Sequence, residues 1–494
     1  MGTQPVRQIM ENVRVGRFKV KAFAIRALHK TGVLRLANKA HALGEKLYGG
    51  ECMSFRQITG LIWPLFVDQL FLQGINILNT AMISSYGPEA ISAVGIIGSF
   101  NFFIISVFMS IATGCAVVVA QYYGRRERGL AARAAAQAVT LTLLITVVIG
   151  AVLLIFTDAA IDMLLGRAEP LTKEYARIFL IGNVVSYPLV GLLQTMMSAL
   201  RGAGNAKATM LFSTGINSLN LALNIVFLYI ARLGVRGLSM SVILCRVVFA
   251  ALAVIYMAHP KNSLRAPIKD YLKIDAPLQR SILFIAVPTG LEQVFFHGGR
   301  IVTQVFIVWF GTMSTTANAI GTTFNGILMV SGQAISMALM TIVGQCIGMG
   351  NIGEAKRYIR RATFTSVVTC ALSSLILLPL MHPLLRFYNL PPEAYRLAYG
   401  AGLMLLIGTP LTWCVSFVTP SGLRAGGDAT FSTVTSLICM WGVRVGLGYV
   451  LGVSLGFGLY GVWFAMFTEW AVRGVVFQLR AAGRKWYSHK VIHD

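Results

Sequence analysis

The chain has 494 residues, of which 56% are hydrophobic and only 12% are charged, and its formal net charge is +24. This composition excludes an ordinary soluble domain and is typical of a polytopic membrane protein. Nucleic-acid binding is also excluded, because it needs a basic face on a soluble fold, whereas the basic residues here fill short gaps between apolar runs.

Residues 1–56 form a basic N-terminal segment with eleven Lys and Arg against three acids. They contain no continuous apolar stretch of the kind found in a cleaved signal peptide. Two interpretations remain open: a helix that lies on an anionic cytoplasmic membrane surface, or a solvated basic tail.

Twelve apolar runs follow the basic segment. A run of about 20 residues crosses a hydrocarbon core of roughly 30 Å as a helix. The runs cover residues 58–84, 92–122, 134–156, 174–200, 208–230, 235–258, 281–309, 317–347, 362–381, 395–420, 428–450 and 457–479. The sequence therefore predicts an all-α polytopic membrane protein with twelve transmembrane helices.

An internal repeat divides these helices into two pseudo-symmetric bundles. Pro64, Asp68 and Gln69 recur as Pro288, Glu292 and Gln293, 224 residues later. Gln121 and Gly124 match Gln345 and Gly348 at the same offset, and Leu200–Asn205 matches Leu423–Asp428 at 223. We predict six-helix bundles at 57–260 and 281–480, a cytoplasmic linker at 261–280 and a basic cytoplasmic tail at 481–494. The repeat is parallel, because each half begins on the same side.

The charges in the gaps predict the orientation. Lys and Arg are concentrated in alternate gaps, for example at residues 125–133, 261–280 and 356–361, and in both terminal segments. The positive-inside rule then places both termini in the cytoplasm, in a plasma (bacterial inner) membrane.

Among the repeated residues, Asp68 and Glu292 have the highest free-energy cost of insertion into a membrane. Each lies inside an apolar run, where a carboxylate costs about 2.5–3.5 kcal/mol on insertion scales. We therefore expect both to face a wet cavity or a partner, and we interpret them as candidates for ion coupling.

Polar stripes accompany both carboxylates. The spacing i, i+4, i+7, i+11 defines one helix face, occupied by Gln69, Gln73, Asn76 and Thr80 in the first run and by Gln293, His297, Arg300 and Gln304 in its equivalent. Such a face lines either a helix–helix seam or a central cavity. A seam accounts poorly for Asp68, Glu292 and Arg300, so a substrate cavity is favoured.

Asparagines and prolines add further candidates. Ser213, Asn217, Asn220 and Asn224 share one face of the fifth run, where they serve packing or line an ion site. Asn183 with Pro188, and Gly408 with Pro410, interrupt the fourth and tenth runs, as hinges, ion ligands or tolerated bends. Arg444 and Glu469 form an internal pair or lie near helix ends.

No catalytic motif is recognisable. The chain has no P-loop, no G-x-S-x-G and no H-E-x-x-H motif, so we expect neither an enzyme nor an organic cofactor. His297 has no neighbouring His or Cys in sequence, and the seven cysteines are scattered, so no metal site is predicted. A carboxylate in each half instead suggests an ion gradient as energy source, with H⁺ or Na⁺ as the coupling ion.

Several motifs together resemble one family. They are Asp68-Gln69-Leu-Phe, Asn79-Thr80-Ala-Met-Ile-Ser, Gly87–Gly95, Thr113–Arg125, Leu200–Asn205, Leu423–Asp428 and Gly461–Met466. The chain is similar to the multidrug and toxic compound extrusion (MATE) transporters of bacteria over residues 55–480. The resemblance implies two six-helix bundles around a central cavity, and export of substrates, often amphipathic organic cations, in exchange for Na⁺ or H⁺.

One departure bears on coupling. Many relatives carry an aspartate where Asn79 stands, and many others carry an acid at the position of Phe296. The resemblance therefore leaves the coupling ion open and adds Asn79 as a candidate for ion coupling beside Asp68 and Glu292. Asn183 and Asn217, from the fourth and fifth runs, are the other candidates.

Taken together, the sequence predicts a monomeric antiporter in the lipid bilayer that exports a small molecule by alternating access. The alternative within transport is a flippase for a lipid-linked or larger metabolite, which would need a larger and more basic cavity. A structure in which Asp68 and Glu292 face packed protein would favour a structural role for them.

Overall fold

A computed structural model of the chain describes residues 42, 44–46, 48–83, 88–166, 168–260, 262–388, 390–489 and 491–492. For residues 76, 77, 79–81, 83, 88 and 387 it describes the backbone alone. The chain forms two compact units, residues 1–59 and 60–494, which are considered separately. The expectations for the basic segment 1–56 lie largely outside the described residues. Within that segment, Glu45 accepts a hydrogen bond from the backbone N–H of Phe55 (2.9 Å).

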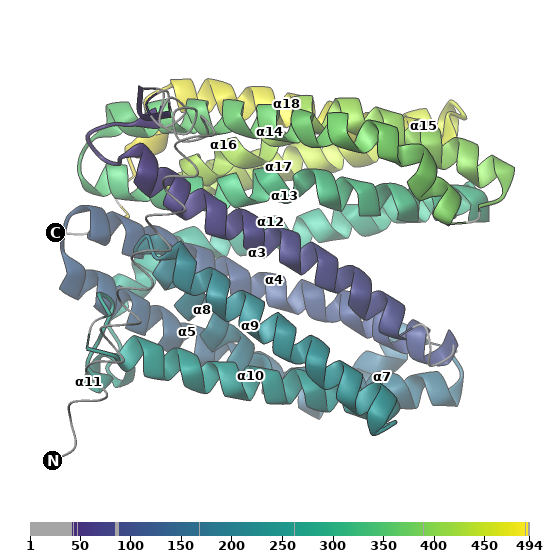
Figure 1. Ribbon diagram of the computed structural model, residues 1–494, viewed down its shortest axis with the longest axis horizontal. Helices are drawn as coiled ribbons and strands as arrows, with labels where there is room; N and C mark the ends of the chain where they lie inside the picture. The colour runs from purple at the N-terminus through teal and green to yellow at the C-terminus, as the bar shows by residue number, and fades with distance from the viewer. Residues whose placement is uncertain are drawn as a thin grey trace, which may run out of the picture. The chain divides into compact units, whose positions relative to one another are not determined.

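The first half consists of long helical segments (Figure 1). They are α3 (Phe55–Ile83), α4 (Pro88–Gly124), α5 (Arg128–Ile155), the broken pair α7 (Pro170–Val185) and α8 (Tyr187–Gly202), α9 (Ala206–Ile225) with η2 (Val226–Ile230), and α10 (Gly234–Ala258). A short helix, α6 (Thr157–Leu165), lies between α5 and α7. The first helix, α3, begins in the smaller unit.

The second half repeats this order. It contains α12 (Ala276–Trp309), α13 (Thr312–Gly348), α14 (Ile352–Phe387), α15 (Pro392–Gly408) continued by η3 (Thr409–Trp413) and α16 (Cys414–Ala425), α17 (Ala429–Ile438) continued by η4 (Cys439–Leu447) and η5 (Val450–Ser454), and α18 (Gly458–Ala482). The linker contains the short helix α11 (Ile268–Leu272), and α12 begins at Ala276, where Asp275 caps it by accepting from Leu278 N–H.

Nine helices in the described part are long and apolar enough to cross a membrane, or ten if α7 and α8 form one span. The remaining two long helices, α12 and α18, contain the buried charges Glu292, Glu469 and Arg473. Together they complete the twelve spans, so the predicted fold class is confirmed. Many large side chains that remain exposed are apolar, as lipid-facing surfaces require.

Both predicted interruptions coincide with irregular helix geometry, but only the first is a break in the helix. In the first half the chain bends by 48° between α7 and α8, where the Ser186 hydroxyl donates to the carbonyl of Asn183 (2.7 Å). In the second half the segment around Pro410 stays continuous as the π-helical η3. A π-helical stretch re-aims the side chains that follow it, and such stretches are frequent at functional sites.

The two halves meet along α4, which packs against both α12 and α13. Near the ends of α4 and α13, Gln121 donates to the carbonyl of Ala425 (2.8 Å) and Gln345 donates to the carbonyl of Gly202 (2.9 Å). A Cβ on Gly124 would lie 2.2 Å from the Gln345 carbonyl oxygen, and one on Gly348 would lie 2.0 Å from that of Gln121. This glutamine junction, formed by Gln121, Gln345, Gly124 and Gly348, therefore relates the halves symmetrically and requires its glycines.

Candidate functional site

Residues 60–494 contain two cavities that are lined by predicted site residues. The first, of about 260 Å³, is lined mainly by α3, α4, α8, α9 and α10 and is called the N-terminal cavity. The second, of about 560 Å³, is lined by α4, α12, α13, η3, α16, η4 and α18 and is called the C-terminal cavity. The larger volume lies within the range of ordinary small-molecule sites.

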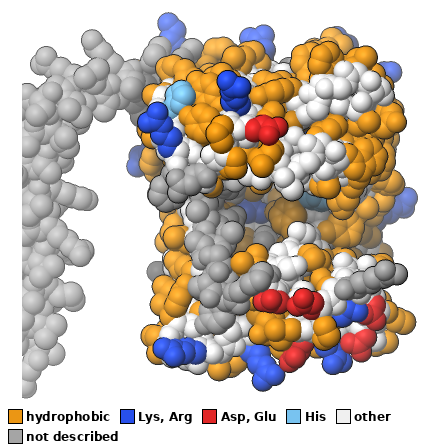
Figure 2. Space-filling view, turned by 90° about the vertical axis from the view of Figure 1, so that its right-hand side faces the viewer, with side chains coloured by type: hydrophobic (Ala, Val, Ile, Leu, Met, Phe, Trp, Pro, Cys, Tyr) orange, Lys and Arg blue, Asp and Glu red, His pale blue; other side chains and the backbone are white. Residues whose placement is uncertain are grey.

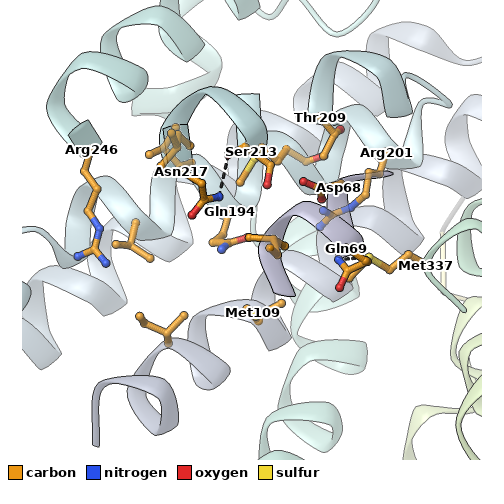
Figure 3. A pocket seen from close by; sticks show the side chains of 16 residues that line it. Asp68, Gln69, Met109, Gln194, Arg201, Thr209, Ser213, Asn217, Arg246 and Met337 are labelled. Carbon is orange, nitrogen blue, oxygen red and sulfur yellow. Dashed lines mark hydrogen bonds between the residues drawn. The ribbon is translucent and has the colours of Figure 1, made fainter. Parts of the chain in front are cut away.

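Asp68 lines the N-terminal cavity (Figure 3). Its side chain is buried, and its Oδ1 accepts no hydrogen bond from any residue that the structure describes. The side chains of Ser213, on α9, and Arg201, near the end of α8, interact with the carboxylate. Asp68 is thus a buried acid whose hydrogen-bonding capacity is only partly filled.

Glu292 has the equivalent partners, an arginine and a serine, within hydrogen-bonding distance. One nitrogen of Arg424 lies 2.9 and 2.8 Å from the two Glu292 oxygens, and the Ser436 hydroxyl donates to Oε1 at 2.8 Å. Both side chains of the ion pair are at most 13% exposed. Arg424 lines the C-terminal cavity, whereas Glu292 lies behind it.

The repeat therefore duplicates a triad of acid, arginine and serine. Asp68, Arg201 and Ser213 correspond to Glu292, Arg424 and Ser436 at offsets of 224, 223 and 223 residues. The second triad is called closed, because Arg424 and Ser436 both donate hydrogen bonds to Glu292. The first is called the open triad, because Asp68 Oδ1 accepts no hydrogen bond from the described residues and its three side chains line a cavity. The two acids thus have the same position in the repeat but different environments.

Other predicted residues complete the N-terminal cavity. Gln69 lies there, with Nε2 3.8 Å from the Met337 sulfur, and so does Asn217, which donates to the carbonyl of Ser213 (2.8 Å). The structure adds Gln194 and Arg246, which the sequence analysis did not single out. The Arg246 guanidinium donates to the Ser186 hydroxyl at the bend between α7 and α8.

Basic and aromatic side chains line the C-terminal cavity. Gln293 and Arg300 from the predicted stripe lie there beside Arg424 and Arg444. Phe296, Trp413, Phe417 and Trp470 form an aromatic wall, in which Trp413 and Phe417 stack with ring centroids 5.1 Å apart. Figure 2 shows the molecule hollowed, with apolar walls and basic side chains at the back of the hollow.

Glu469 is a second buried acid of this half. It lies 3.1 Å from Arg473 and 4.0 Å from Arg444, so the two arginines share one carboxylate. The Arg473 guanidinium also lies 4.3 Å from the ring centroid of Phe417, behind the aromatic wall. Arg444 and Glu469 therefore form an internal pair, one of the two alternatives that the sequence left open.

Several predicted residues lie outside both cavities. His297 packs edge-on against Phe102, Gln304 accepts from Asn318, Asn183 donates within its own helix, and Asn220 and Asn224 bond to Ser241 and to each other. Gln73 lies beside Gly326 on α13. The side chains of Asn76, Asn79 and Thr80 are outside the described residues.

Sequence reasoning missed four arginines. Arg201 and Arg424 were assigned to gaps between helices, but the structure places them at cavities beside the two acids. Arg246 and Arg473 lie within the long helices α10 and α18. The signal that could have found the latter two is the same one that identified Asp68, namely a charge within an apolar run.

Comparisons with known proteins agree with this architecture. The MatE family model matches residues 64–226 and again residues 288–450, which confirms the repeat at an offset of 224. YisQ, an uncharacterized transporter of Bacillus subtilis, is 27% identical over 87% of this chain and 94% of its own length. The probable multidrug resistance protein NorM of Thermotoga maritima is 24% identical over 88% of this chain and 94% of its own length.

Solved structures share the fold. A MATE protein in the straight conformation superposes with a TM-score of 0.80 at 19% identity, covering 89% of this chain and 97% of the other. A MOP superfamily transporter from Pyrococcus furiosus, for which reverse polarity of the binding pocket is said to suggest a different function, gives 0.79 at 19% identity over the same shares. The two family matches together cover more than half of the sequence. The chain therefore belongs to the MatE family and is a multi-pass membrane transporter.

Proposed function

We propose that the chain is a secondary active antiporter that exports small amphipathic organic compounds in exchange for H⁺ or Na⁺ by alternating access. Its membership of a transporter family and its two cavities inside the helical unit support this proposal. We further propose that the halves 57–260 and 281–480 move relative to each other in the inner (plasma) membrane, with both termini in the cytoplasm.

The single observation that carries the coupling proposal is the open triad. The buried Asp68 has an oxygen that accepts no hydrogen bond from the described residues, and it lies at a cavity large enough for water or a small cation. An incompletely solvated carboxylate is costly inside a membrane protein, and a bound cation offsets that cost. We assign the coupling ion to Asp68, with Ser213 and Asn217 beside it.

Glu292 suits this role less well in the same conformation. Arg424 and Ser436 already satisfy its carboxylate, so binding an ion there requires breaking a buried pair. We therefore propose that Glu292 positions Arg424 at the C-terminal cavity. Asn79 and Asn183 remain proposed contributors to ion coupling, and the stripe residues remain proposed contributors to the substrate cavity.

The proposal is tested in everted membrane vesicles with imposed H⁺ or Na⁺ gradients. Uptake of two naphthalene probes, 2-naphthyltrimethylammonium and naphthalene-2-sulfonate, is compared for the wild type, Asp68→Asn and Asp158→Asn. Asp158 is a matched control because its side chain is 74% exposed on α6. We expect one gradient to drive uptake of at least one probe and Asp68→Asn alone to abolish that stimulation. Undiminished gradient-driven uptake in Asp68→Asn would contradict the assignment.

A second candidate, a flippase for a lipid-linked substrate, is favoured by one observation. The lining of the C-terminal cavity contains Arg300, Arg424 and Arg444 and, among the described residues, no acid. A flippase would move a fluorescent anionic lipid between leaflets of proteoliposomes without an imposed ion gradient, whereas the antiporter would not.

A further inference from the structure

The C-terminal cavity contains an arginine that has no acidic partner among the described residues. Arg300 lines this cavity, and its guanidinium donates no hydrogen bond and forms no ion pair with any residue that the structure describes. Its side chain remains accessible although α12 lies inside the helical unit, because it faces the open cavity. Because a guanidinium is always charged, solvent or a ligand has to stabilise this charge.

A second guanidinium faces the same cavity as Arg300. Arg444 lines this cavity from the π-helical segment η4. Its Nε has no hydrogen-bond partner among the described residues, and its nearest acid, Glu469, is 4.0 Å away and is held more tightly by Arg473. Two like charges brought together without a full counter-charge form a site for an anion.

The balance of buried charge points the same way. Around the C-terminal cavity four arginines, Arg300, Arg424, Arg444 and Arg473, meet two acids, Glu292 and Glu469. Glu292 pairs with Arg424, and Arg444 and Arg473 share Glu469, so the four arginines exceed the two acids by two positive charges within the described residues. The N-terminal cavity adds Arg201 and Arg246 against Asp68.

The aromatic wall is also unsuited to a cation. Aromatic faces usually attract organic cations through the negative face of the ring. Here the Arg473 guanidinium already lies 4.3 Å from the Phe417 centroid and 5.7 Å from that of Phe296. Its field opposes a second cation at these rings, whereas an uncharged apolar body still gains from contact with Trp413, Phe417 and Trp470.

We propose that the C-terminal cavity binds an amphipathic organic anion, whose oxyanion group is held by Arg300 and Arg444 and whose apolar body lies against the aromatic wall. This proposal rests on the transport function above and specifies its substrate class. A planar guanidinium fork matches a carboxylate, sulfonate or phosphate in bidentate geometry. At about 560 Å³ the cavity has room for an anion with a fused-ring or similar body.

Binding is measured by calorimetry on the purified full chain in an uncharged detergent. The probes are naphthalene-2-sulfonate and 2-naphthyltrimethylammonium, which share an apolar body and differ in charge. We expect the sulfonate to bind and the ammonium to bind at least about tenfold more weakly, since a charge-assisted contact contributes that order of affinity.

Three variants locate the site. Arg300→Gln and Arg444→Gln should each weaken sulfonate binding by about 10- to 100-fold. Arg300→Lys should recover part of that loss, because it keeps the charge but not the fork. Arg396→Gln is the matched control, since Arg396 is exposed on α15 and does not line the cavity; its affinity should equal that of the wild type.

The oxyanion can belong to a soluble compound or to a lipid headgroup. Adding phosphatidylglycerol to the detergent separates the two sources: displacement of the sulfonate assigns the site to an anionic lipid, and unchanged binding assigns it to soluble anions. Either outcome supports an anion site. A cation that binds as tightly as the sulfonate, or a sulfonate affinity within twofold of the wild type in Arg300→Gln, overturns the proposal.

Failure of this proposal can be distinguished from failure of the antiport function. The binding measurement needs no ion gradient, and the Asp68→Asn transport measurement needs no particular charge on the probe. A protein that binds the cation and still loses gradient-driven uptake in Asp68→Asn would keep the antiport function and refute the anion site.

Discussion

Asp68 and Glu292 show how residue environment separates two equivalent positions. Both are buried acids with an arginine and a serine from the corresponding helices. Glu292 is fully paired, whereas one oxygen of Asp68 has no hydrogen bond from the described residues. Removing the charge should therefore destabilise the protein to different extents at the two sites.

We predict that Glu292→Gln destabilises the protein by about 3–5 kcal/mol, because it leaves the buried charge of Arg424 uncompensated. Asp68→Asn should destabilise the protein by less, because Arg201 lines the N-terminal cavity, where solvent can compensate its charge, and because the variant removes an incompletely satisfied carboxylate. Thermal unfolding in detergent measures both. The double variant Glu292→Gln/Arg424→Gln should recover part of the loss, and equal destabilisation by Glu292→Gln and Asp68→Asn would contradict the distinction between the triads.

At the scale of elements, the segment that follows α18 packs against the repeated motif Leu423–Asp428. After α18, the segment η6 (Lys485–Tyr487) places Trp486, which is fully buried, against Gly426. Asp428 accepts from Arg480 (2.7 Å) in the same region. Val491 and Ile492 join the apolar core of the first half. The predicted basic tail therefore also contains apolar side chains, and these pack against both halves.

We predict that Trp486→Ala lowers the free energy of unfolding by about 3–5 kcal/mol, as expected when a fully buried indole is truncated. Trp309→Ala is the matched control, because that indole is 60% exposed at the end of α12. Unfolding midpoints of the two variants should differ clearly. Similar midpoints would show that the docked segment contributes little to stability.

At the scale of the whole helical unit, the glutamine junction holds the two halves together at one end. Its glycines allow the backbones of α4 and α13 to approach, and its glutamines bond across the halves. Alternating access requires such a contact to open in one state and close in the other. The junction is therefore the part of the interface most sensitive to added side-chain volume.

We predict that Gly124→Ala and Gly348→Ala shift the protein away from the state in which this end is closed, at a cost of about 1–3 kcal/mol for that state. Spin labels at Arg128→Cys and Arg357→Cys, both exposed near the starts of α5 and α14, report the distance between the halves. Gly98→Ala on α4 is the control, since a Cβ there meets nothing within 4 Å. An unchanged distance distribution in Gly348→Ala would argue against this role.

The sequence by itself determined the membrane class, the twelve spans, the repeat and the positions of Asp68, Glu292, Arg300 and the two helix interruptions. These features could be predicted because they depend on hydrophobic run length, on residue identity at a fixed offset and on the cost of a charge in an apolar run. Each can be read from the order of residues along the chain, without knowing which helices pack together.

Only the tertiary structure decided which of these residues share a site. Arg424 and Ser436 reach Glu292 from 132 and 144 positions away, and no periodicity within one helix indicates such partners. The orientation of α12 about its axis likewise decides that His297 and Gln304 pack against neighbouring helices and that Arg300 lines a cavity. A buried charge is costly in any fold, but whether a partner offsets that cost depends on which distant helices pack together.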